Sequence, residues 1–311
     1  MNSKNDYIRE YLGVDKFHAA GYTGKRVHAL TGERIEGDTV KEHAKQTRLA
    51  FLEIAPDAAL TYAPFPGASN TAPEFAKLRG DACVMFVSLA VEGSNGAAYA
   101  DPVIPERMFV CVGAGNYGDN YANGMMAPDS VYGVGAVDVR WSAMRGGKPL
   151  PGAKLLVQSA QYTSHSENVD FGAAAGIYLP GYIDTFPGTS CAAPVLAGMA
   201  ALVNDFFIAK TGRPLPHLSM LRFFKDHSVD IEEAGKDRKS GWGVPVLPDP
   251  ESIDIWYYQV PEEKPAEPVA VAKTPRQIVQ EKAGLEDKTM DYLAAYTWGK
   301  ELLEKLAKAM Q

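Results

Sequence analysis

A long segment after Ser190 is apolar on nearly every side, and this limits where it can lie in a folded chain. Its large residues recur without a polar face over the length of a helix. A helix that is apolar all round is buried, either in the centre of a protein or in a membrane. No run of about 18 consecutive apolar residues suited to a membrane occurs in the sequence. We therefore expect a central, buried helix over Ala192–Ala209.

Short β-type runs alternate with helical stretches between about residues 20 and 245. This order is typical of a parallel sheet with helices on both faces, because crossover connections join parallel strands. We expect strands at 27–31, 59–62, 83–89, 108–112, 131–137 and 155–157, and further helices at 40–54, 71–78 and 218–227. The expected fold class is α/β, with three α/β/α layers around a mostly parallel central sheet.

The composition changes after Pro245, where proline and glutamate become frequent. Such a segment is typical of a stiff, extended linker. A helix start follows at Thr274-Pro275-Arg276-Gln277, and spaced apolar residues continue after it. We expect a first domain over residues 1–248, a linker over 249–273 and a small helical module over 274–311, with the break in composition near residue 262.

Bulk composition excludes several classes of partner. The chain has 31 Lys plus Arg against 38 Asp plus Glu, a net charge of −7, and no long run of like charges. We expect no nucleic-acid partner, and no membrane partner because no segment reads as a secretion signal or a span. The three cysteines, Cys83, Cys111 and Cys191, lie in apolar runs without metal-ligand spacing, so we expect reduced core thiols and a cytoplasmic location.

Ser190 stands in a run suited to a nucleophile, Gly188-Thr189-Ser190-Cys191-Ala192-Ala193-Pro194-Val195-Leu196-Ala197-Gly198. A serine hydroxyl needs a base to take its proton and donors to hold the oxyanion. A helix start offers free backbone N–H groups, and Pro194 is tolerated only in a first turn. Cys191 is an alternative nucleophile, because a helix N-terminus can lower a thiol pKa.

This run resembles the serine motif of the subtilisin-like serine peptidases, Gly-Thr-Ser-x-Ala-x-Pro-x-x-x-Gly, at every fixed position. The resemblance extends over about residues 7–248. It implies the subtilisin fold and hydrolysis of peptide bonds by a compact member of that family. It also implies an apolar role for Cys191, whose position carries a side chain turned away from the substrate.

The segment from Glu42 to Ala58 resembles the histidine helix of that family and implies that His43 is the general base. Ala44 and Lys45 stand where glycine and threonine are usual. Upstream, Gly21-Tyr22-Thr23-Gly24 resembles the approach to the first core strand, whose acid position falls on Glu33. A glutamate is longer than the usual aspartate by about 1.5 Å. Asp38 is the alternative acid, and a third interpretation has neither acid facing the histidine.

The resemblance assigns the oxyanion amide to Asn116, which follows a strand and a glycine turn. It assigns substrate binding by strand pairing to Ser88, Leu89 and Ala90, where alanine replaces a usual glycine. The chemistry requires no metal or cofactor. Structural calcium is common in relatives, but no acidic loop in this sequence indicates it.

Three hypotheses about function follow. The first is a serine endopeptidase with Glu33, His43, Ser190 and Asn116 at its site and a protein or peptide as substrate. The second is a catalytically impaired protein of the same fold that acts as a binding or assembly module. In the third, the C-terminal helices have the principal role in assembly or targeting, and they are our candidate for self-association. The chain either folds unaided or is the mature part of a longer precursor.

Overall fold

The computed structural model describes residues 4–33, 35–36, 39–64, 80–89, 107–127, 129–145, 148–259, 275–295 and 299–310. It divides into two compact units, Met1–Pro261 and Glu262–Gln311, which we treat separately.

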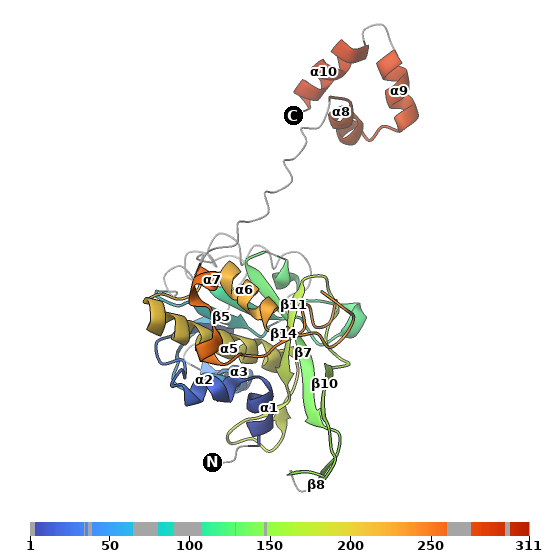
Figure 1. Ribbon diagram of the computed structural model, residues 1–311. Helices are drawn as coiled ribbons and strands as arrows, with labels where there is room; N and C mark the ends of the chain where they lie inside the picture. Colours follow the sequence, from blue (N-terminus) through green and yellow to red (C-terminus); the bar gives the residue numbers. More distant parts are fainter. Residues whose placement is uncertain are drawn as a thin grey trace. The chain divides into compact units, whose positions relative to one another are not determined.

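The first unit is built around a seven-stranded sheet with the order β10-β7-β6-β5-β1-β4, in which β11 also pairs with β7 (Figure 1). All pairings are parallel except that of β10 with β7. The strands are β1 (His28–Glu33), β4 (Ala59–Pro64), β5 (Val84–Val87), β6 (Phe109–Gly113), β7 (Val131–Trp141), β10 (Leu155–Ser159) and β11 (Val169–Ala175). The prediction of an α/β fold around a mostly parallel sheet is confirmed.

Four two-stranded pairings and three 3-10 turns lie outside this sheet in the described residues. The short strands are β2 (Ile35–Glu36), β3 (Thr39–Val40), β8 (Met144–Arg145), β9 (Lys148–Pro149), β12 (Ile177–Tyr178), β13 (Thr185–Phe186), β14 (Ser228–Val229) and β15 (Val244–Pro245). The 3-10 turns are η2 (Gly118–Asn120), η3 (Gly124–Met126) and η4 (Pro250–Ser252).

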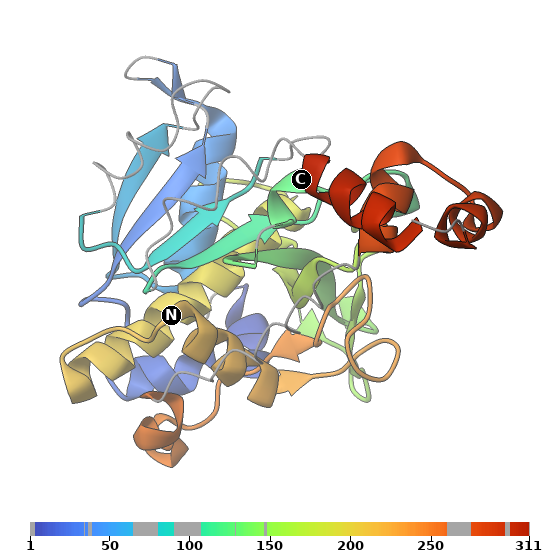
Figure 2. The same cartoon turned by 90° about the horizontal axis from the view of Figure 1, so that it is seen from above.

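Helix α5 (Thr189–Thr211) lies along one face of the sheet and packs closely against α3 (Glu42–Ile54) (Figure 2). Among the described residues, α5 is the one helix long and apolar enough to cross a membrane, and 94% of its most apolar window is buried within the protein. It is therefore the central helix that the sequence predicts, longer than expected at both ends. The same face carries α1 (Asp6–Tyr11), α2 (Val14–Ala19) and α6 (His217–Asp226) in one apolar core.

Of the helices expected from the sequence, one begins two residues later than predicted and one cannot be compared. The helix expected from Val40 begins at Glu42, because Val40 pairs with Ile35 in a short hairpin. The helix expected at 71–78 lies outside the described residues.

Opposite the α5 face, a second apolar cluster contains alternate residues of the strands, among them Leu30 of β1.

Residues 249–259 fall in the range expected as a linker, yet they form η4 and α7 (Ile255–Gln259). Tyr258 explains why: its ring packs 5.0 Å from that of Phe223, and its hydroxyl donates to the Asp226 carboxylate at 3.1 Å. Both partners belong to α6, so this part of the chain folds onto the first unit.

The second unit contains α8 (Pro275–Ala283), α9 (Asp287–Ala295) and α10 (Gly299–Ala309). Val279, Met290, Leu303 and Ala307 form its small buried core, one or two residues from each helix. Gly284 ends α8 with a φ of 63°, a conformation that favours glycine. The first of these helices, α8, begins at Pro275, the proline that the sequence places in a first turn.

Candidate active site

The candidate site lies where several parallel strands end. Glu33 closes β1, Ser88 and Leu89 follow β5, and Gly113 closes β6. Because the carboxyl ends of parallel strands meet at one edge of a sheet, the loops beyond them form a crevice. The structure has a pocket of about 250 Å³ there. Its lining includes most residues that the sequence singles out, namely Glu33, His43, Ser88, Leu89, Asn116 and Ser190.

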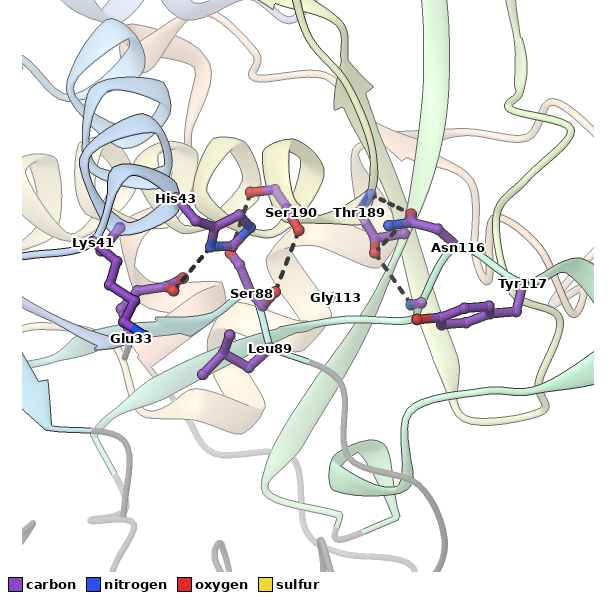
Figure 3. Close-up of a pocket in the computed structure, with 12 residues that line it drawn as sticks. Glu33, Lys41, His43, Ser88, Leu89, Gly113, Asn116, Tyr117, Thr189 and Ser190 are labelled. Carbon is purple, nitrogen blue, oxygen red and sulfur yellow. Dashed lines mark hydrogen bonds and ion pairs between the residues drawn. The ribbon is translucent and has the colours of Figure 1, made fainter. Parts of the chain in front are cut away.

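Glu33 and His43 are in direct contact. Side chains alternate along β1, so Glu33 lies on the same face as Ala29, which packs in the core with α3 and α5. His43 lies in the first turn of α3, and its Nδ1 is 3.1 Å from Glu33 Oε2 (Figure 3). The Glu33 residue is only 1% exposed, whereas the His43 side chain is 39% exposed. The longer acid therefore reaches the histidine from a buried position, while Asp38 lies outside the described residues.

The His43 ring also contacts a second segment of the chain, strand β13. The ring of Phe186 in β13 meets it edge-on, with centroids 5.9 Å apart. Phe186 is buried, so it forms a fixed wall beside the ring. The other carboxylate oxygen of Glu33, Oε1, is buried without a hydrogen-bond partner among the described residues.

Ser190 lies in the first turn of α5, and its hydroxyl donates to the carbonyl oxygen of Ser88 at 3.3 Å. In return, the Ser88 hydroxyl donates to the carbonyl oxygen of Ser190 at 3.2 Å (Figure 3). In the described part of the chain, the Ser190 hydroxyl thus makes its hydrogen bond to Ser88 and none to His43. Catalytic hydrogen bonds are often long before substrate binds, so this arrangement is compatible with a nucleophile and base at rest.

Asn116 is oriented by the residue before the serine. Its Oδ1 accepts from the Thr189 N–H at 2.9 Å and from the Thr189 hydroxyl at 3.2 Å. Because both groups donate, the amide oxygen must face Thr189, which leaves the Nδ2 donors toward Ser190 (Figure 3). Gly188 makes room: a Cβ there would lie 3.2 Å from Asn116 Nδ2, and its φ of 88° favours glycine.

Cys191, the alternative nucleophile, is placed differently. It is fully buried, and its Sγ faces the carbonyl oxygen of Ala174. Burial raises the pKa of this thiol to about 12, so it stays protonated and unreactive near neutral pH. This geometry rules against a cysteine nucleophile and fits the apolar role that the family resemblance implies.

Ala44 and Lys45, which stand where the family usually has glycine and threonine after the histidine, occupy different environments. Ala44 is buried, whereas the exposed Lys45 turns outward and pairs with Glu42 at 3.5 Å. Close packing of α3 on α5 comes from Gly198, where a Cβ would lie 2.7 Å from Ile54 Cβ. The last glycine of the serine motif therefore brings the helix of His43 close to the helix of Ser190.

Two residues that shape the site carry no recognisable mark in the sequence. Tyr162 accepts a hydrogen bond from the Gly188 N–H at 3.0 Å, which holds the turn before the nucleophile. Asn123 donates from Nδ2 to the carbonyl oxygens of Leu89 and Gly113, both at 2.9 Å, and so links the ends of β5 and β6.

Ala90, expected to continue the substrate strand, lies outside the described residues. Within the described ranges, no three His, Cys, Asp or Glu side chains gather as a metal site.

No protein-family model and no curated protein sequence matches this chain. Solved structures do match. A lanthipeptide protease is 17% identical, with a TM-score of 0.59 over 78% of this chain and 93% of its own. Fervidolysin from Fervidobacterium pennivorans, a keratinolytic enzyme related to subtilisin, is 16% identical, with a TM-score of 0.56 over 77% of this chain and 45% of its own. The PatG macrocyclase, solved with a peptide, is 11% identical, with a TM-score of 0.56 over 79% of this chain and 96% of its own.

These similarities concern the backbone, since the identities are low, and the activities of the similar proteins differ. The chain has the fold of the subtilisin-like proteases.

Proposed function

We propose that this protein is a serine endopeptidase that forms an acyl-enzyme on Ser190. His43 removes the hydroxyl proton as the oxygen attacks a peptide carbonyl, and later gives the proton to the leaving amine. Glu33 accepts the other ring N–H, which fixes the tautomer and stabilises the imidazolium. Asn116 Nδ2 and the Ser190 backbone N–H, free at a helix start, hold the oxyanion. Water then releases the acyl group.

The observation that carries this proposal is the 3.1 Å contact between Glu33 and His43 in the pocket that also contains Ser190 and Asn116. A buried carboxylate against an exposed histidine, with a serine at a helix start nearby, matches the acid, base and nucleophile order of this chemistry. Solved proteases of the same fold support the assignment. The groups present suffice for acyl transfer, so the proposed reaction needs no metal or cofactor.

A fluorophosphonate probe tests the proposal, because it reacts only with an activated serine. We expect the wild-type protein to be labelled and Ser190→Ala to be silent. Glu33→Gln keeps the shape but loses the charge, and should slow labelling by about four orders of magnitude, as for other triad acids. Cys191→Ala is the matched control and should label normally. Labelling that persists in Ser190→Ala would overturn the assignment.

A non-catalytic binding module of the same fold is the second candidate. The observation in its favour is the Ser190 hydrogen bond to Ser88, which leaves the nucleophile without a bond to its base. In that case the wild-type protein would resist the probe while still binding peptides. Labelling by the probe excludes this candidate.

A further inference from the structure

A second pocket, of about 490 Å³, shares helix α3 with the candidate active site. One wall is the outer side of α3, beginning at Glu42, the immediate neighbour of His43. The other wall is the turn between β12 and β13, the hairpin whose Phe186 touches the His43 ring. Its lining residues are Glu42, Lys45, Arg48, Leu49, Tyr62, Pro180, Gly181 and Tyr182.

Positively charged side chains outnumber negatively charged ones in the lining of this pocket. Glu42 is already engaged, because it accepts a hydrogen bond from the Tyr182 hydroxyl and pairs with Lys45. Arg48 is exposed and forms no ion pair or hydrogen bond with the residues that the structure describes. An unpaired guanidinium with its planar fork of donors suits a carboxylate.

The position of the pocket indicates which part of a substrate would reach it. The acyl side of a peptide would lie along Ser88 and Leu89, and its leaving amine must approach His43 to receive a proton. The chain beyond that amine then continues past His43 and Phe186. An extended peptide rises about 3.3 Å per residue, so its first three residues after the cleaved bond cover about 10 Å.

We propose that this pocket is a specificity site for the leaving-group side of the substrate and that it selects an aspartate or glutamate within three residues after the cleaved bond. Arg48 is the principal contact, and Lys45 offsets the charge of Glu42 in the same lining. The inference rests on the proposed peptidase function. Tyr62 and Tyr182 line the pocket with flat rings beside the cations.

The test is digestion of a proteome-derived peptide library, with the residues after each cleaved bond read by mass spectrometry. For the wild type we expect acidic residues to be enriched about threefold to fivefold, as for a solvent-accessible ion pair. Arg48→Gln should lose the enrichment, and Arg48→Glu should deplete acidic residues and favour Lys and Arg. Arg213→Gln, an exposed arginine outside the pocket lining, should keep the wild-type profile.

Fluorophosphonate labelling serves as the second readout, because the probe has no peptide on the leaving-group side. Its rate should be unchanged in all three variants, which shows that they fold and keep an active serine. Cleavage by the wild type without acidic enrichment, or an unchanged profile in Arg48→Glu, would overturn this inference alone. A wild-type protein that neither labels nor cleaves would overturn the proposed function and this inference with it.

Discussion

The distance between His43 and Ser190 depends on how closely α3 packs on α5, and Gly198→Ala tests that dependence. The added Cβ would lie 2.7 Å from Ile54 Cβ and 3.1 Å from the Phe51 carbonyl oxygen, closer than ordinary contact at 3.4–4 Å. Neither atom is the end of a flexible side chain. The two helices must therefore separate by several tenths of an ångström.

Two effects oppose each other in this variant. Alanine gains about 1 kcal/mol of helix propensity over glycine. Overpacking in a core costs about 1–3 kcal/mol, and contact with a Cβ and a backbone oxygen favours the upper end. The net loss is then about 2 kcal/mol, which lowers the melting temperature by about 4–8 °C in a domain of this size. Misplacement of the base should slow fluorophosphonate labelling by about tenfold to a hundredfold.

Thermal denaturation and the labelling rate of the folded protein measure the two effects. Ile54→Val is the matched control: it removes the Cδ1 methyl group of the same side chain and costs about 1 kcal/mol, but it keeps the Cβ and Cγ2 that face Gly198 and pushes nothing apart. It should therefore label at the wild-type rate. A Gly198→Ala protein that melts at or above the wild-type temperature, or that labels normally, would show that Gly198 does not set the helix spacing.

Three further predictions concern the oxyanion donor, the thiols and a buried carboxylate. Asn116→Ala should lower turnover of a cleaved peptide by about a hundredfold to a thousandfold, as is typical when one oxyanion donor is removed, and an undiminished rate would contradict its role. Cys83 and Cys191 have pKa values raised by burial from 9.0 to about 12, so their contribution to stability is complete below pH 9 and is lost as the pH rises toward 12. Melting temperatures from pH 7 to 11 should fall above pH 9, less steeply in Cys191→Ala, and equal slopes would count against the thiols. Asp205 is fully buried and accepts from the Thr23 and Gly24 N–H groups at 3.0 Å and from Arg26 at 2.8 Å, so Asp205→Ala should cost about 3–5 kcal/mol in chemical denaturation, and a loss under 1 kcal/mol would refute this.

The fold and the order of the site residues could be predicted because their patterns are local. Strand β5 is an apolar run, and the nucleophile turn and its helix form one continuous motif. Strand β11 was missed because its alanines and glycine lack the β-branched side chains typical of strands, and its place beside β7 comes from tertiary packing. Helix α7 was missed because prolines surround it, while its stability comes from Tyr258 contacts with α6.

The supporting residues of the site could not be predicted for a different reason. Tyr162 and Asn123 act through contacts 26 and 34 residues away in the chain, so no spacing near them marks their roles. The contact between Glu33 and His43 required both the alternation along β1 and the start of α3, which fixes where the histidine points. The pocket beside α3 depends on Tyr182, which lies 140 residues from Glu42.

The paired hydrogen bonds between Ser88 and Ser190 engage the nucleophile hydroxyl while no substrate is bound. The carbonyl oxygen that receives the Ser190 hydroxyl belongs to the segment along which an extended substrate would pair. A peptide whose backbone N–H donates to that carbonyl oxygen would compete with the Ser190 hydroxyl for it and favour rotation of the hydroxyl toward His43. In the proposed reaction, occupancy of the substrate strand and availability of the nucleophile are therefore coupled through the Ser88 carbonyl oxygen.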